Sequence, residues 1–265
     1  MTGTYCQDLK WPTGAGHFFS SNFGENRGDH FHMGLDIKTN GSTGAEVMAV
    51  EDGYIHRLVS NYNGYGKALY LMTVSGHEVL YAHLDSFTPV LEKVWRMQQA
   101  RRRSYRVDAN FSRREFQVKK GDVIGYSGNS GNSFGPHLHF EYRSSKSEPL
   151  NPLIMAFDIP DHVTPIPKRL ALIPLSRGSM VNASQLVQSM PLFRDKSGVY
   201  HFADTLSVFG DFAFAIQAID KLEGSNNSYQ FQKAELLIDG REHFELDYTK
   251  IPFSHGHAAT TVIQF

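Results

Sequence analysis

The sequence predicts a mainly all-β protein, in which an antiparallel β-roll with an inserted helix is followed by a smaller β-sandwich. Short segments that alternate apolar and polar residues recur along most of the 265 residues. Glycine, asparagine and aspartate separate these segments, and glycine alone contributes 23 residues. Two polar, proline-containing stretches, 144–152 and 158–167, divide the segments into two series. Together these observations favour two β domains.

The first series begins at about residue 44 and is typical of antiparallel hairpins. Its expected strands are 45–50, 54–60, 67–74, 78–84, 116–128 and 137–143. The alternation stops between about 87 and 115, where Pro89 can open a helix. Four apolar residues recur there at helical spacing: Val90, Leu91, Val94 and Trp95. We therefore expect a helical insert at about 87–115, within a first domain over residues 1–155.

The second series predicts a smaller domain of β-sandwich type over residues 156–265. Its expected strands are 169–175, 212–220, 234–240 and 243–248. The sequence stops at "VIQF" without a closing polar tail. This ending suggests that the natural chain is longer and that the second domain is truncated.

The composition indicates a globular protein, with 41% hydrophobic and 20% charged residues. The net charge of −1 gives no indication of a nucleic-acid partner. A single cysteine, Cys6, excludes an intrachain disulfide, and it lacks the preceding residues of a lipoprotein cleavage site. No signal peptide is visible, and no apolar run approaches the ~18–20 residues that span a bilayer. The chain is therefore expected to be cytosolic, or else a mature or trimmed form.

The stretch "DHFHMGLDIKT" (29–39) places His32 four residues before Asp36. In an extended strand these two residues would lie about 13 Å apart. Ligands of one zinc ion lie only about 2.0–2.2 Å from the metal. The pair can share a metal only if the backbone curls between them, and Gly34 offers that freedom. Otherwise they are two polar loop residues, and His30 is expected to point away with a supporting or surface role.

The segment "GPHLHFEYR" supplies two more histidines, His137 and His139, on one side of a strand. Two neutral imidazoles on one face both need partners, which makes a plain core position unfavourable. A catalytic zinc usually has three protein ligands and a water. One of these histidines would complete the set, and the spacing does not say which. His83, in "YAHL", is either an exposed, locally bonded residue or a catalytic histidine near the water.

The order of these motifs resembles the M23 family of zinc metallopeptidases, also called LytM or lysostaphin-type endopeptidases. The resemblance covers roughly residues 16–150 and is carried by HxxxD, "YAHL" and the long glycine-histidine motif that ends in "GPHLHFE". It implies a two-layer antiparallel β-roll. It also implies Zn²⁺ ligands at His32, Asp36 and His139, and catalytic histidines at His83 and His137.

This resemblance implies hydrolysis of peptide cross-links in bacterial peptidoglycan, with the stem peptides as partners and a periplasmic, extracellular or cell-envelope location. The alternative is a catalytically silent regulator that binds the wall or activates a cell-wall amidase, although a complete ligand set argues against it. In a third reading the protein binds surfaces through its β-sandwich. More loosely, the second domain resembles the Ig-like modules of Bacteroidetes-type members, which could dock an envelope protein.

The insert departs from the compact members of the family because it is longer and strongly basic. Its cations are Lys93, Arg96, Arg101, Arg102, Arg103, Arg106, Arg113 and Arg114. They form either a solvated helix face or a wall that meets anionic groups of the envelope. Few aromatic residues interleave with them, which argues against nucleic acid. The "SHGH" pair, His255 and His257, repeats the HxH spacing without an HxxxD partner in its own half, and we expect no metal site there.

Overall fold

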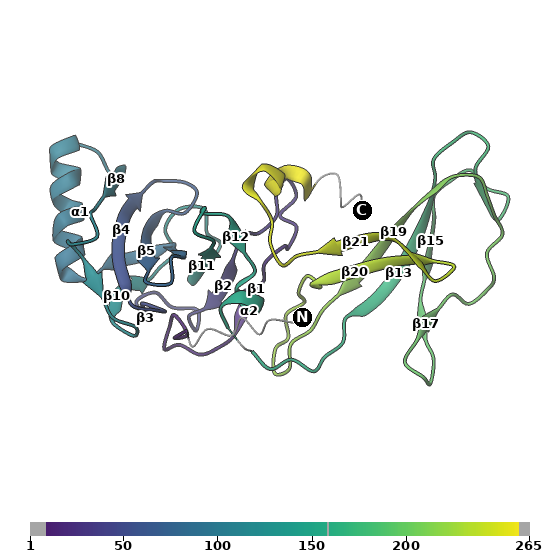
Figure 1. Cartoon of the computed structure of the whole chain (residues 1–265), viewed down its shortest axis with the longest axis horizontal. Helices are drawn as coiled ribbons and strands as arrows, with labels where there is room; N and C mark the ends of the chain where they lie inside the picture. Colours follow the sequence, from purple (N-terminus) through teal and green to yellow (C-terminus); the bar gives the residue numbers. More distant parts are fainter. Residues whose placement is uncertain (1–8, 158, 260–265) are drawn as a thin grey trace.

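The structure is a computed structural model that describes residues 9–157 and 159–259. Cys6 and the final "VIQF" lie outside the described residues. Figure 1 shows a β-rich body with helix α1 (Pro89–Arg102) at one end of the long axis and a second β-rich part at the other. All sheets are antiparallel within the described residues, so the predicted mainly all-β class is confirmed. The domain boundaries stay a prediction.

The first part of the chain forms a large and a small sheet. The large sheet has nine strands in the order β1-β2-β11-β6-β5-β4-β8, while β12 pairs with β11 and β9 with β4. Its strands are β1 (Phe19–Ser21), β2 (Leu35–Lys38), β4 (Gly53–Ser60), β5 (Lys67–Thr73), β6 (Glu78–Ala82), β8 (Val107–Asn110), β9 (Gln117–Val118), β11 (His137–Arg143) and β12 (Pro149–Leu150). The small sheet has the order β3-β10-β7, with β3 (Glu46–Met48), β10 (Val123–Ser127) and β7 (Leu84–Phe87).

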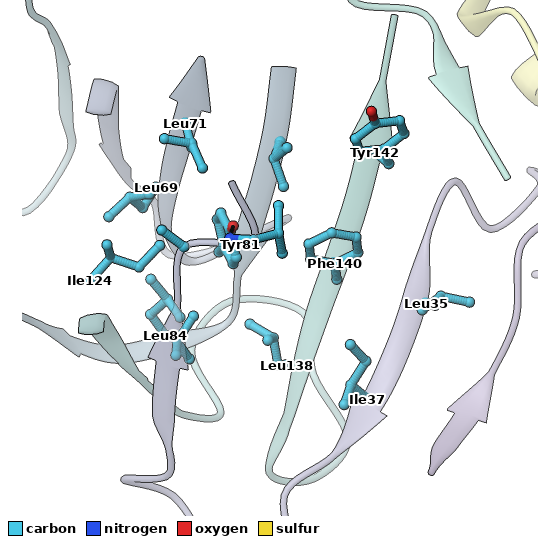
Figure 2. Close-up of a cluster of buried hydrophobic side chains, with 14 of the residues drawn as sticks. Leu35, Ile37, Leu69, Leu71, Tyr81, Leu84, Ile124, Leu138, Phe140 and Tyr142 are labelled. Carbon is cyan, nitrogen blue, oxygen red and sulfur yellow. Dashed lines mark hydrogen bonds between the residues drawn. The ribbon is translucent and has the colours of Figure 1, made fainter. Parts of the chain in front are cut away.

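Side chains of the central strand β11 point alternately into the core and to the opposite face of the sheet. Leu138, Phe140 and Tyr142 are fully buried and belong to the main hydrophobic cluster. Figure 2 shows them beside Leu35 and Ile37 of β2, in line with Tyr81 and the strands beyond. Because neighbouring side chains of a strand point to opposite faces, His137, His139 and Glu141 all lie on the other side.

Gly34 permits a close approach between chain segments and does not need an unusual φ. Its φ is not among the positive values of the chain. A Cβ built on Gly34 would lie 2.3 Å from the carbonyl oxygen of Phe140. The sequence predicts that Gly34 serves as a flexible bend, whereas in the structure its role is to allow close packing. The missing side chain lets the segment before β2 lie against the backbone of β11.

Replacing Gly34 by alanine is expected to destabilise the fold by about 1–3 kcal/mol, the range for overpacking a tight site. The carbonyl of Phe140 belongs to a central strand and cannot move away cheaply. The measurement is urea unfolding of the two proteins. Gly41→Ala is the control for the loss of a glycine without a steric clash, because a Cβ at position 41 would meet nothing within 4 Å. Its φ of 70° means that this control also includes the cost of backbone strain. A Gly34→Ala protein no less stable than this control would contradict the explanation.

The expected helical insert is present as α1, which closes against the large sheet. Pro89 occupies the first turn, Glu92 adds a carboxylate there, and Arg101 and Arg102 lie in the last turn. Both charge placements suit the helix dipole. Leu91 and Trp95 are buried, whereas Val90 is 64% exposed and does not face the core. The sequence pattern missed β8, which lies inside the predicted insert and pairs with β4.

The rest of the chain forms the C-terminal region, defined here as residues 159–259, which follows helix α2 (Pro152–Met155). It contains a three-stranded sheet in the order β15-β13-β19 and three two-stranded ribbons. The strands are β13 (Ile166–Pro174), β14 (Met180–Val181), β15 (Gln188–Pro191), β16 (Phe193–Arg194), β17 (Tyr200–His201), β18 (Val208–Phe209), β19 (Phe212–Ile219), β20 (Lys233–Ile238) and β21 (Arg241–Asp247), and a 3-10 helix, η1 (Phe253–Ala258), follows. A second β-rich part is thus confirmed, and its Ig-like character stays a prediction.

Candidate metal centre

Three side chains from distant parts of the sequence meet on the outer face of β2 and β11. Asp36 Oδ1 lies 3.0 Å from His32 Nε2 and 2.9 Å from His139 Nδ1. The two imidazole nitrogens lie 3.1 Å apart. All three residues are buried. In the part of the chain that the structure describes, no other group of histidine, cysteine and acidic side chains meets the same test of three close ligand atoms.

The fold explains why these residues meet. Asp36 and His139 are directly opposite each other in the antiparallel pairing of β2 with β11. Cross-strand neighbours of this kind have Cβ atoms about 4.5–5.5 Å apart. His32 lies in the loop before β2, and two backbone hydrogen bonds hold it near the strand. Gly24 N–H donates to the carbonyl of His32, and His32 N–H donates to the carbonyl of Glu25, each at 2.8 Å. Chain curvature, as expected, brings His32 to Asp36.

Second partners fix which nitrogen of each imidazole faces the cluster. His32 Nδ1 lies 2.8 Å from the carbonyl oxygen of Asn22, so this nitrogen carries the proton and donates it. His139 Nε2 lies 2.9 Å from the carboxylate of Glu141 and donates in the same way. His32 Nε2 and His139 Nδ1 then face Asp36, and each offers a lone pair when its imidazole is neutral. Arg27 Nη2 donates to the other oxygen of Asp36 at 2.5 Å.

This arrangement fits a divalent metal ion. Three electron-pair donors that lie within 3.1 Å of one another repel unless a cation or a proton lies between them. In a tetrahedral site with bonds of about 2.0–2.2 Å, ligand atoms are roughly 3.3–3.6 Å apart, so small outward shifts would accommodate an ion. Nitrogen and carboxylate donors suit zinc, and the histidine–carboxylate pair of His139 and Glu141 is the usual outer support of such a ligand.

The charges of the cluster are strongly coupled. Burial would raise the pKa of Asp36, but the charge of His32 and hydrogen bonds from three histidines hold that pKa far below its ordinary value. Burial would also lower the pKa of His139, yet its hydrogen bonds to Asp36 and Glu141 raise it to about 9. Burial, with the charges of His139 and Arg27, lowers the pKa of His32, although Asp36 opposes this shift. The site therefore favours positive charge at its centre.

A buried ion network lies behind the cluster, on the same face of β11. Glu141 is fully buried and accepts hydrogen bonds from His139, from the hydroxyl of Tyr65 at 2.5 Å and from Arg143 at 2.8 Å. Arg143 also donates to Glu78 at 2.8 Å. Burial opposes ionisation of Glu141, but its bond to His139 and the charge of Arg143 lower its pKa to about 2. A charged Glu141 thus keeps His139 oriented.

His83 and His137 lie next to this group. Their ring centroids are 4.8 Å apart, and the ring of His83 is 5.7 Å from that of His139. His83 Nδ1 donates to the carbonyl of Ser130 at 2.8 Å, which leaves Nε2 as an acceptor. Burial, with the charges of His139 and His137, lowers the pKa of His83 to about 4, so the imidazole is neutral at pH 7. His137 Nδ1 faces the carbonyl of Gly135 at 2.8 Å, and its Nε2 lies 3.5 Å from Asp36.

The structure thus brings together all five residues that the sequence singled out, while their roles as ligands and catalysts stay predictions. His30 is exposed and pairs with Asp29 at 2.6 Å. His257 lies near this pair, outside the three-donor group, and its Nδ1 is 3.1 Å from the carbonyl of Asp29. The sequence argument missed Arg27, Tyr65 and Glu141. Only Glu141 had a visible signal, because it continues the one-sided series of His137 and His139.

Comparisons with known proteins agree with this site. The sequence model of Peptidase family M23 matches residues 105–152. The chain is 33% identical over 130 residues to the DD-carboxypeptidase/endopeptidase Mpg of Neisseria meningitidis serogroup B. This alignment covers 49% of the chain and 24% of that protein. It is 28% identical over 122 residues to an uncharacterized metalloprotease of Haemophilus influenzae. That alignment covers 46% of this chain and 20% of that protein. The matches therefore span about a quarter or less of these curated relatives.

Among solved structures, a zinc-containing peptidase from Vibrio cholerae aligns with a TM-score of 0.40 and 24% identity, over 57% of this chain and 40% of that one. The family match and the His-Asp-His group together support a metallopeptidase domain. The chain is therefore similar to peptidase family M23 over part of its length. No helix among the described residues is long and apolar enough to cross a bilayer.

Proposed function

We propose that this protein is a zinc metalloendopeptidase that hydrolyses peptide cross-links of bacterial peptidoglycan. The observation that carries the proposal is the convergence of His32, Asp36 and His139, with two further histidines at its edge. The match of residues 105–152 to the model of Peptidase family M23 and the similarity to an enzyme named DD-carboxypeptidase/endopeptidase support a peptide substrate of the cell wall. A location in the periplasm or outside the cell follows from that substrate.

Bound by these three residues, zinc would supply a Lewis acid that polarises the scissile carbonyl and acidifies a water. His83 can take a proton at Nε2, because its Nδ1 proton is held by Ser130 and its imidazole is neutral at pH 7. His137 is the more accessible of the two, with 17% of its side chain exposed. It is suited to donate a proton or a hydrogen bond to the substrate. Burial of His32 and His139 keeps bulk water from competing for their nitrogens.

The test is to incubate purified peptidoglycan with the protein and to measure new amino termini, with and without a chelator. We expect release that stops on chelation and returns on addition of zinc. His137→Ala is expected to lower the rate by about 10²–10⁴, the range for loss of a positioned acid or base. His255→Ala is the matched control, since this histidine lies outside the five-residue site.

No release at any zinc concentration, with intact folding, would contradict the enzyme and favour a silent wall-binding regulator. Release that persists in the chelator would contradict the role of the metal. Identification of the released termini by mass spectrometry then defines the scissile bond and tests whether it is a stem-peptide cross-link.

A further inference from the structure

The loop that carries His32 is packed against the C-terminal region on its far side. We call residues 22–33 the ligand loop. Phe23 and Phe31 of this loop are buried in one cluster with Phe231 and Tyr248 of the C-terminal region. This cluster is separate from the main core, so the ligand loop depends on the C-terminal region for most of its apolar contacts.

Close backbone contacts continue this interface. Phe31 N–H donates to the carbonyl of Gly256 at 2.9 Å. Gly24 has a φ of 82°, and a Cβ there would lie 3.0 Å from the ring of Tyr248. A side chain at position 24 would therefore meet both backbone strain and the ring. The loop and the C-terminal region fit each other too closely for a flexible connection.

Asn22 joins this interface to the candidate metal centre. Its side-chain amide donates to the carbonyl of Gln230 at 2.8 Å and accepts from the N–H of Gln230 at 2.9 Å. Its own carbonyl accepts the Nδ1 proton of His32 at 2.8 Å. Asn22 is buried, with 7% of its surface exposed. A single residue thus bonds the C-terminal region through its side chain and His32 through its main chain.

We propose that Asn22 is a positioning residue through which the C-terminal region holds the imidazole of His32 in its metal-binding orientation. The proposal rests on the proposed role of His32 as a ligand. Two bonds to the main chain of one residue, Gln230, fix the plane of the Asn22 amide and limit how far its backbone can move. The carbonyl that sets the tautomer and direction of His32 is fixed with it. The C-terminal region is then part of the metal centre and more than a spacer.

Asn22→Ala is the direct test, because it removes the side-chain bonds and keeps the carbonyl. Loss of outer partners of a metal ligand typically costs about 10–100-fold in metal affinity. We expect about tenfold here, because the Asn22 carbonyl and the Ser21 hydroxyl, the two direct partners of His32 Nδ1, both remain. Zinc affinity of the full chain is measured by competition with a chromogenic chelator. The melting temperature of the metal-free protein is measured beside it. Asn22→Ser, a milder change, replaces Asn22→Ala if that variant does not fold.

Asn227→Ala is the matched control. Asn227 also bonds across the interface, donating to the carbonyl of Ser20 at 3.0 Å and accepting from Lys38 at 2.6 Å, but it does not touch Asn22 or His32. We expect it to lower the melting temperature without changing zinc affinity. Equal zinc affinity in wild type and the Asn22 variant, or an equal loss in the Asn227 variant, overturns the proposal. A wild-type protein that binds no zinc overturns the proposed function as well.

Discussion

Asp36→Asn is expected to abolish tight metal binding and endopeptidase activity together. The substitution keeps the shape of the side chain and removes the charge that lies within 3.0 Å of both imidazole nitrogens. An amide oxygen is a much weaker ligand for zinc than a carboxylate. We expect zinc affinity to fall by more than about 100-fold, beyond the range for loss of an outer partner. Activity should fall in proportion to the zinc that is lost.

The same stretch of sequence offers a matched control, Asp29→Asn. Asp29 is also acidic and pairs with a histidine, but its side chain is 79% exposed and the partner is His30. We expect unchanged zinc affinity and unchanged activity. Zinc content is measured by atomic absorption after dialysis, and activity by release of amino termini from peptidoglycan. An Asp36→Asn protein that retains stoichiometric zinc after dialysis would contradict the assignment of Asp36.

The largest effect on stability is expected from Arg143→Ala. This substitution leaves the buried carboxylates of Glu141 and Glu78 without their common cation. Breaking a buried ion pair from one side typically costs about 3–5 kcal/mol, because a buried charge remains uncompensated. Urea unfolding of the metal-free protein measures the change. The orientation of His139 should loosen too, since Glu141 would lose its main counter-charge.

Arg57→Ala separates this effect from the loss of any arginine. Arg57 pairs with Asp108 at the surface, and both Arg57 and Arg143 lie over the ring of Tyr70, at 5.0 and 5.6 Å. Exposed pairs contribute about 0–1 kcal/mol. We therefore expect Arg57→Ala to cost far less than Arg143→Ala. Equal losses would mean that the ring contact, and not the buried charge, determines the stability of this network.

Much of the β architecture could be predicted because its signals are local. The strand 137–143 has the predicted bounds, since its alternation and its glycine-rich start are both visible in the sequence. The strand β8 was missed because four residues among many arginines show too short an alternation to outweigh the helical pattern before them. Gly34 was given the wrong role, because a close approach to Phe140 depends on pairing with a strand about a hundred residues away.

The residues of the candidate site could be predicted from the sequence, whereas the residues that support them could not. Strand spacing placed His137 and His139 on one face, whereas the resemblance carried by short motifs gave His32, Asp36 and His83 their expected roles. The bond from Asn22 to Gln230 joins residues 208 positions apart, and neither residue belongs to a motif. The Tyr65 hydroxyl, just before β5, reaches Glu141 on β11 only after β6 has paired with both strands. Supports of this kind come from tertiary packing, and a pattern within one segment does not contain them.

Position 83 combines backbone strain with a proposed catalytic role. His83 has a φ of 59°, in the left-handed region that favours glycine, at the point where the chain passes from β6 to β7. This conformation costs an ordinary residue roughly 1–2 kcal/mol. Glycine would relieve that strain and carry no imidazole. The imidazole is also buried and bonded to the carbonyl of Ser130, so a His83→Gly variant sets relief of backbone strain against loss of these contacts and of a proposed catalytic group.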